Sequence, residues 1–125
     1  MQTMRYTGIK GKAWEAVRSY VKGRETDCYT CGKKNLSGAD AQCGHYRTVA
    51  EVGSNNERCW MKEIIHLQCS YCNGARGGAQ AKYRARLVKD YGEEWVDKYD
   101  KDVDSKKYAA IKDWKRIIDT FSEVL

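Results

Sequence analysis

Two cysteine pairs with the same spacing constrain the fold of this chain more than any other feature of its sequence. Cys28 and Cys31 form the first pair, in DCYTCGKKN, and Cys69 and Cys72 form the second, in CSYCNGARGG. Two CxxC pairs supply four thiolates, which suits tetrahedral Zn²⁺ in a closed structural site. Because binding of a structural zinc supplies much of the folding free energy, we predict that Zn²⁺ ties the two segments together and that loss of one cysteine unfolds the domain.

The length and composition favour one small domain. A chain of 125 residues allows a modest core, and domains of this size often need a metal or a partner for stability. The mean hydropathy is −0.79, and no run of about 18 apolar residues is present, so we expect no membrane span. No apolar segment follows the basic start, so we expect no secretory signal and a cytoplasmic protein. In a reducing compartment, six cysteines are better explained as metal ligands or buried thiols than as three disulfides.

The charge of the chain is positive and unevenly spread. The net charge is +6, and residues 1–90 carry 16 Lys and Arg against 8 Asp and Glu, whereas residues 91–125 carry 7 against 9. A positive face attracts a polyanion, most simply nucleic acid, and makes binding depend on salt. The alternative is a basic surface that serves only solubility.

The spacing of apolar residues predicts an α+β fold around the cysteine pairs. We expect a helix that begins near residue 11 and ends near Gly23, two extended segments over 42–49 and 60–68 that pair as a hairpin, and a helix over 73–91. We call the turn that holds each CxxC pair a knuckle: the first at Cys28–Cys31 and the second at Cys69–Cys72. A hairpin between the two knuckles, followed by a helix after the second one, is the order of elements in a treble-clef or ββα-metal core. The predicted fold is therefore a zinc-stapled core of this kind, flanked by an N-terminal helix and by C-terminal helices.

The end of the chain has the pattern of an amphipathic helix. We expect it over residues 104–125, capped by Asp104, and following a core domain over 1–103. Its apolar positions recur in steps of three and four: Ile111, Trp114, Ile118, Phe121 and Leu125. Two interpretations stay open, since such a helix can close over the core of its own chain or form a short dimer seam.

Two histidines are present, and both lie between the cysteine pairs. His45 falls on the first extended segment and His66 on the second, and in an antiparallel pair they can face one cleft. Each can instead be a satisfied structural histidine. A second alternative is a Cys₂His₂ zinc site in which Cys43 and Cys59 join them. Otherwise these two cysteines are small buried residues.

The order of motifs resembles a known family. CxTCG, then GHY, then HLQCxxCN, then a helix containing KYR and ending in DYGEEWVD is similar to the phage NinG (Rap) recombination endonucleases, as is the leading KAWEAVRSYVKGRE. The second cysteine pair, CSYCNGARGG, is also similar to that of phage endonuclease VII. The resemblance covers about residues 10–100 and implies a nuclease of the His-Asn-His, or ββα-metal, superfamily.

The resemblance also implies roles for two residues. By its match to the GH motif, His45 would be the general base that takes a proton from the attacking water. By its match to the residue after the second cysteine pair, Asn73 would bind catalytic Mg²⁺ through its carbonyl oxygen. Both roles suit the chemistry of phosphodiester hydrolysis.

The second Mg²⁺ ligand departs from the pattern. Many relatives have Asp immediately before the first histidine as this ligand, and this chain has Gly44 there. His66 is the favoured replacement because it matches a histidine in the NinG pattern. Asp40 comes next, and Glu63 is a further candidate.

A basic run without acidic residues follows the second cysteine pair. On a helix that begins at the cleft, these side chains can hold DNA phosphates, or they can form an ordinary solvated face. The predicted DNA-binding residues are Arg76, Lys82, Arg84, Arg86 and Lys89, with Arg47 from the hairpin.

These observations lead to one hypothesis and its rivals. The resemblance implies a Mg²⁺-dependent DNA endonuclease, with Mn²⁺ as a substitute, that acts on branched DNA such as Holliday junctions or D-loops. Symmetric cutting of a junction requires a homodimer. The alternatives are a non-catalytic zinc module that only binds DNA, and a nicking, restriction or terminase-associated nuclease of the same superfamily.

Overall fold

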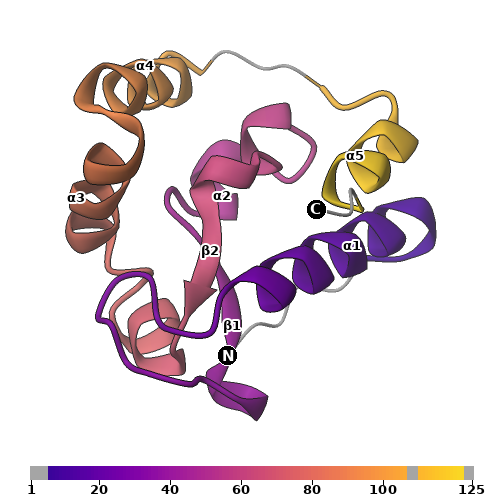
Figure 1. Cartoon of the computed structure of the whole chain (residues 1–125). Helices are drawn as coiled ribbons and strands as arrows, with labels where there is room; N and C mark the ends of the chain where they lie inside the picture. The colour runs from indigo at the N-terminus through magenta and orange to yellow at the C-terminus, as the bar shows by residue number, and fades with distance from the viewer. Residues whose placement is uncertain (1–5, 107–109, 123–125) are drawn as a thin grey trace.

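The computed structural model describes residues 6–106 and 110–122. Within these residues, helices surround a two-stranded antiparallel sheet (Figure 1), which confirms a mixed fold of helices and a small sheet. None of these helices is long and apolar enough to cross a membrane. In chain order the helices and strands are α1 (Gly8–Arg24), β1 (Gln42–His45), α2 (Val49–Val52), β2 (Ile65–Gln68), α3 (Gln80–Tyr91), α4 (Glu93–Asp104) and α5 (Trp114–Phe121).

The two strands form the hairpin that was predicted between the cysteine pairs. In its register, Gly44 lies opposite His66 and His45 lies opposite Ile65. Every residue of β2 is buried, because α1 packs on the sheet from one side and α3 lies on the other (Figure 1). From α3, the Tyr83 hydroxyl donates hydrogen bonds to the carbonyl oxygens of Gly44 and Ile64, which ties this helix to both arms of the hairpin.

The strands are shorter than the predicted segments 42–49 and 60–68. The first strand ends because Thr48 begins α2 with a capping box: its side chain accepts a hydrogen bond from the backbone N–H of Glu51, and the Glu51 carboxylate accepts one from the backbone N–H of Thr48. A series of short turns then leads to β2. Local capping therefore overrides the extended pattern of the apolar residues.

Helix α1 confirms the first predicted helix. It buries the apolar stripe of Ala13, Trp14, Val17 and Val21 against the rest of the core. Helix α5 packs against α1, where the rings of Tyr20 and Phe121 meet edge to face at 5.5 Å.

The predicted helix over 104–125 is wrong in its extent. Asp104 ends α4 instead of starting a helix, and α5 begins after Asp113, whose side chain accepts a hydrogen bond from the backbone N–H of Arg116. Helix α5 buries Ile117 and Phe121 within its own chain, so its apolar face closes over the core as in the first interpretation. Leu125, the last residue of the predicted stripe, lies outside the described residues.

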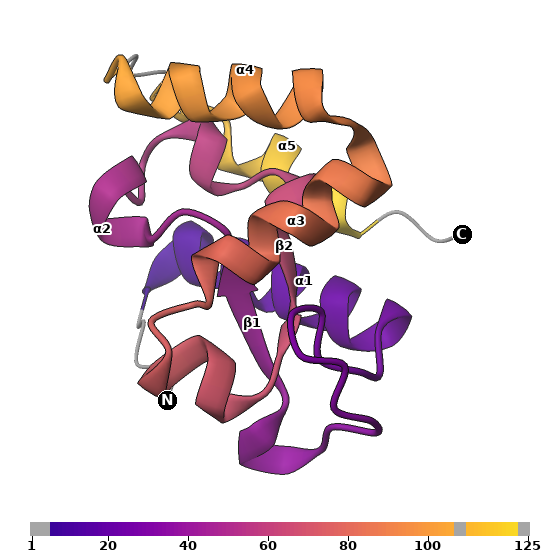
Figure 2. The same ribbon diagram turned by 90° about the vertical axis from the view of Figure 1, so that its left-hand side faces the viewer.

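The predicted continuous helix over 73–91 is also wrong. Residues 71–75 form a π-helical turn, and α3 starts only at Gln80. Between them Gly77, Gly78 and Ala79 all have positive φ, at 59°, 95° and 51°, which an α-helix cannot contain. The turn and α4 lie at opposite ends of the molecule (Figure 2).

Candidate metal centre and active site

The four cysteines of the two pairs come together in one cluster. Their sulfur atoms all lie within 4.8 Å of one another, and the sulfurs of Cys31 and Cys69 are 3.7 Å apart. A zinc ion at about 2.3 Å from four sulfurs places those sulfurs about 3.8 Å apart. The cluster can therefore hold a tetrahedral zinc ion, as its spacing in the sequence predicts.

The backbone of each knuckle is arranged for thiolates. The N–H groups of Cys31 and Cys72 point at the sulfurs of Cys28 and Cys69, at 3.4 Å in both cases. Burial raises the pKa of the Cys28 thiol, but hydrogen bonds from Thr30 and from backbone N–H groups outweigh this effect and lower the pKa to about 6. Because zinc binds the thiolate, a thiol that ionises this readily suits a ligand. Burial raises the pKa of the neighbouring Cys72 thiol to about 12, so zinc binding would have to release the proton of that ligand.

The alternative of a second zinc site finds no support in the structure. The four-cysteine cluster is the one group of potential metal ligands found within residues 6–106 and 110–122. Cys43 and Cys59 are 1% and 2% exposed and belong to the hydrophobic core. They occupy the place of small buried residues.

His45 ends β1 and lies against α1. Its ring stacks on Trp14, with ring centroids 5.8 Å apart and planes 13° from parallel. Its Nε2 lies 3.0 Å from the carbonyl oxygen of Cys59. A carbonyl oxygen only accepts, so Nε2 carries the proton in this contact and the neutral ring keeps a lone pair on Nδ1. Burial lowers the pKa of His45 to about 4, which leaves the ring neutral at pH 7.

Asn73 lies beside the residue that precedes His45. Its side-chain nitrogen donates a hydrogen bond of 2.8 Å to Oε1 of Gln42. Its Oδ1 faces Gly44, because a Cβ atom added to that glycine would lie only 2.9 Å away. The structure thus brings Asn73 next to the GH motif, as the hypothesis of a shared site requires.

The sequence analysis missed a third residue at this point, Gln68. Its side chain is fully buried, and its Oε1 has no hydrogen-bond partner among the described residues. A Cβ atom on Gly44 would lie 1.7 Å from this oxygen. A signal was present in the sequence, since Gln68 is the polar end of the apolar run IIHLQ directly before Cys69.

His66 lies opposite Gly44 in the register, but its ring is engaged away from Asn73. The prediction that the two histidines face one cleft is wrong, because they occupy successive positions of the register and their side chains extend to opposite faces of the sheet. Nδ1 of His66 lies 2.7 Å from the Glu25 carboxylate and Nε2 lies 2.9 Å from the carbonyl oxygen of Glu63. Its ring stacks on Tyr29 at 3.7 Å. With both nitrogens held against protein oxygens, His66 does not face a magnesium ion at Asn73.

Asp40 is also engaged elsewhere. One carboxylate oxygen lies 2.6 Å from Lys33, and the other accepts hydrogen bonds of 2.8 Å from the backbone and the hydroxyl of Ser70. The hydrogen bond from Lys33 and those from Ser70 lower the pKa of Asp40 to about 2. Asp40 therefore joins the chain after the first knuckle to the start of the second one.

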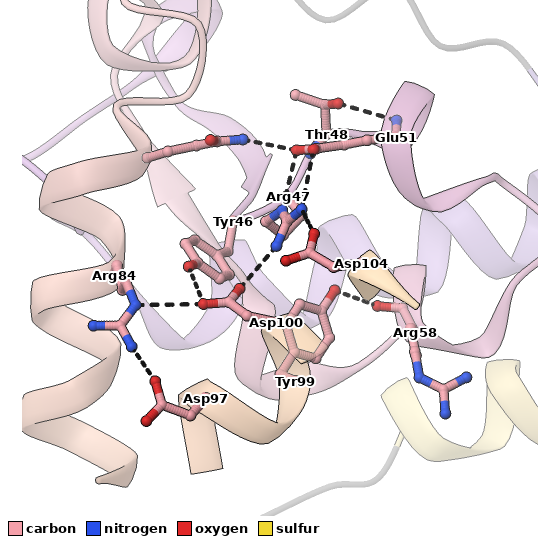
Figure 3. A network of polar contacts seen from close by, with 11 residues as sticks. Tyr46, Arg47, Thr48, Glu51, Arg58, Arg84, Asp97, Tyr99, Asp100 and Asp104 are labelled. Atoms are coloured by element: carbon pink, nitrogen blue, oxygen red, sulfur yellow. Dashed lines mark hydrogen bonds and ion pairs between the residues drawn. The ribbon is translucent and has the colours of Figure 1, made fainter. Parts of the chain in front are cut away.

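Two of the predicted DNA-binding arginines form ion pairs with α4. Figure 3 shows that Arg47 and Arg84 both reach Asp100, at 3.0 and 3.3 Å. Arg47 also contacts Asp104 at 2.6 Å, and Arg84 also pairs with Asp97. The acidic residues of α4, which fall in the acidic last part of the sequence, thus neutralise these two cations.

The other predicted cations have exposed side chains. Lys82 and Lys89 lie on α3 and make no ion pair with a described residue, and Arg76 lies over the ring of the exposed Tyr71 at 5.8 Å. Arg86 covers the ring of Tyr29 at 4.4 Å. Because the backbone at residues 77–79 is not helical, Arg76 is not part of α3.

Comparisons with known proteins identify the family. The family model described as bacteriophage lambda NinG protein matches residues 5–125. Curated proteins named Protein ninG are similar as well: 37% identity over 90 residues for that of Escherichia phage lambda, 34% over 88 for that of Escherichia phage 933W, and 32% over 93 for that of Salmonella phage P22. No solved structure matches.

The matched region covers different shares of this chain and of its relatives. It covers 69–73% of this chain but only 41–43% of these three relatives, so the chain spans less than half their length. The family model, in contrast, extends over nearly the whole chain. The chain belongs to the NinG family.

Proposed function

We propose that this chain is a divalent-cation-dependent DNA endonuclease with a zinc-stapled ββα-metal core. The observation that carries the proposal is the hydrogen bond from Nε2 of His45 to the Cys59 carbonyl oxygen. Because Nε2 carries the proton, Nδ1 is unprotonated and can act as a base. His45 directly follows Gly44, the residue that Asn73 contacts. Among the described residues, Nδ1 has no hydrogen-bond partner. The resemblance to His-Asn-His nucleases supports the same assignment.

His45 is the general base of the proposed reaction. Nδ1 accepts a proton from a water molecule while the water oxygen attacks the phosphorus atom and the 3′ oxygen leaves. The stacked Trp14 ring and the bond to Cys59 hold the imidazole in one orientation. Fixing the base in this way is what lets a small site position a reactive water.

Asn73 would hold the catalytic cation, Mg²⁺ or Mn²⁺. An amide oxygen is a ligand that such hard cations accept, and the cation would stabilise negative charge on the phosphate and the leaving oxygen. Gly44 and His45 are consecutive residues at the end of β1, so their side-chain positions lie on opposite faces of the sheet, and the base and the cation would have to meet the phosphate at the end of the strand.

The zinc ion would take no part in the reaction. Asn73 directly follows Cys72 and donates its backbone N–H to the Cys69 carbonyl oxygen at 3.0 Å. Zinc at the four cysteines would fix this turn relative to the hairpin. Rigid support of this kind keeps a catalytic group within a fraction of an ångström of its working position.

The DNA substrate is proposed from charge and from the family resemblance. Arg76, Lys82 and Lys89 supply exposed positive charge after the second knuckle, whereas Arg47 and Arg84 are neutralised by α4. Branched recombination intermediates and a homodimer rest on the resemblance alone. Since the apolar face of α5 packs within its own chain, a dimer would use another surface.

A cleavage assay tests this proposal. Zinc-loaded protein is incubated with linear duplex, nicked duplex, flap and four-way junction DNA, with and without added Mg²⁺ after dialysis, because a chelator would also remove zinc. We expect Mg²⁺-dependent cutting that falls about 10²-fold or more in His45→Ala, as for loss of a general base, and that also falls in Asn73→Ala. Gln80→Ala is the control. Full cutting by His45→Ala would exclude the mechanism, and salt-dependent binding without any cutting would favour the non-catalytic DNA-binding module.

A further inference from the structure

A buried carboxamide oxygen beside Gly44 has no partner in the described part of the chain. It is Oε1 of Gln68, whose side chain is 0% exposed. Leaving a polar atom buried and unpaired costs about 1–3 kcal/mol, so such an atom in a native fold needs an explanation, of which a bound ion is one.

The orientation of this carboxamide is determined by its nitrogen. Nε2 of Gln68 donates to the carbonyl oxygen of Gly78 at 2.9 Å and to the hydroxyl of Thr30 at 3.0 Å. The Gly78 carbonyl oxygen can only accept, so the nitrogen must lie on that side. Both of its hydrogens are used, and Oε1 is turned toward Gly44.

The Asn73 carboxamide is oriented in the same way. Nε2 of Gln42 donates to the Ala39 carbonyl oxygen at 2.9 Å, which turns Oε1 of Gln42 toward Asn73. The Asn73 nitrogen donates to that oxygen at 2.8 Å. Its own Oδ1 is therefore left facing Gly44, and no described residue donates to it.

Gly44 leaves the space in which these two oxygens meet. The position of a Cβ atom on Gly44 lies 1.7 Å from Oε1 of Gln68 and 2.9 Å from Oδ1 of Asn73. The two oxygens are thus separated by no more than 4.6 Å, the sum of 1.7 and 2.9 Å, and two oxygens that share one cation at about 2.1 Å lie up to about 4.2 Å apart. Any side chain at position 44 would displace the Gln68 oxygen.

We infer that Gln68 is the second protein ligand of the divalent cation, binding through Oε1 together with Oδ1 of Asn73. This inference rests on the proposed function for the presence of a cation, but it assigns the ligand from the hairpin geometry. Both ligands are neutral, so the cation keeps its full charge for phosphate oxygens. Mg²⁺ commonly takes few protein ligands and completes its shell with water and substrate phosphates, so we expect weak binding that tightens when DNA is present.

Nuclear magnetic resonance on the zinc-loaded chain tests the inference without measuring cleavage. Paramagnetic Mn²⁺ is added, and broadening of the side-chain NH₂ signals is followed. We expect the signals of Gln68 and Asn73 to broaden equally and first, ahead of Gln42, whose carboxamide lies one hydrogen bond behind Asn73. The signal of Gln80, which binds Glu51 instead, is the control. Excess Mg²⁺ should reverse the effect.

The result separates this inference from the proposed function. Strong broadening of Asn73 with Gln68 no more affected than Gln42 would overturn the assignment of Gln68 and leave the nuclease proposal in place. Absence of any site-specific broadening, with or without an uncleaved DNA duplex, would overturn both.

Variants give a second, independent test. We expect Gln68→Leu to weaken Mn²⁺ binding about 10-fold or more, with zinc content unchanged, while Gln80→Leu leaves it unaltered. The double variant Gly44→Asp with Gln68→Ala places a carboxylate from β1 in the same space, so it should restore Mn²⁺ binding. Unchanged Mn²⁺ binding by Gln68→Leu would overturn the inference, and failure of the folded, zinc-loaded double variant to bind Mn²⁺ would count against it.

Discussion

Nε2 of His45 donates a hydrogen bond to the carbonyl oxygen of Cys59, although the two residues belong to different segments of the chain. The bond fixes the tautomer of the ring, and the Trp14 ring covers one of its faces. A half-buried neutral histidine in this setting has measurable consequences for stability as well as for chemistry.

The stability of the fold should decrease as the pH is lowered from 6.5 to 4, because of His45. Burial lowers its pKa from 6.5 to about 4, so in this window the unfolded chain binds a proton that the folded chain does not. Stability therefore rises with pH through the window and is lost as the pH falls, by up to about 3 kcal/mol. Denaturant unfolding at several pH values measures this slope.

Acid also protonates the zinc thiolates, so the comparison needs a control. His45→Gln keeps the cysteines and loses only the titrating ring, and its stability should fall less between pH 6.5 and pH 4 than that of the wild type. Equal pH dependence of the two proteins would contradict the assignment of a neutral His45.

Zinc binding should depend on four of the six cysteines, those of the two CxxC pairs. We expect one zinc ion per chain, its loss in Cys69→Ser together with loss of cooperative unfolding, and its retention in Cys59→Ala, which only leaves a small cavity in the core. Metal analysis and thermal unfolding of the purified variants measure both properties. A second zinc ion per chain, or full zinc content in Cys69→Ser, would contradict the assignment.

Thr30 should link the zinc centre to the cation site. Its hydroxyl accepts a hydrogen bond from Gln68 and lies 3.4 Å from the sulfur of Cys28. Thr30→Val keeps the shape but removes both contacts, so we expect weaker Mn²⁺ binding with the zinc still bound. Thr30→Ser, which keeps the hydroxyl, should behave like the wild type.

Exposed and paired cations should differ in DNA binding. Lys82→Ala and Lys89→Ala should each weaken binding to all sequences and reduce the salt dependence by about one phosphate contact. Arg84→Ala should leave the salt dependence nearly unchanged and lower the melting temperature, since Arg84 holds Asp97 and Asp100 of α4 (Figure 3). A salt titration of DNA affinity separates the two classes.

His66 should matter for stability and not for cation binding. Its ring joins the half-buried residues Glu25 and Glu63 to the buried ring of Tyr29. We expect His66→Ala to lower the free energy of unfolding by about 1–3 kcal/mol, because two hydrogen bonds and the ring stacking are lost. Mn²⁺ affinity, measured in the range where the variant is folded, should be unchanged.

Much of the architecture follows from the sequence by itself. The CxxC spacing determines two knuckles that can share one metal, because each pair brings its sulfurs together within a single turn. The periodic apolar residues of 11–25 determine α1, and the two extended segments determine a hairpin between the knuckles. These features depend on neighbours within a few residues, which is the range over which sequence patterns act.

Only the tertiary structure decided the composition of the candidate site. A register that differs by one residue would put His45 and His66 on the same face, and no pattern in two short strands specifies that register. The meeting of Gln68 and Asn73 over Gly44 requires the hairpin and the second knuckle to be in place together, and the pairing of Arg84 with Asp100 requires α4 to fold back on α3. Such contacts join segments distant in the chain, so their partners are decided by packing and by the shape of the core.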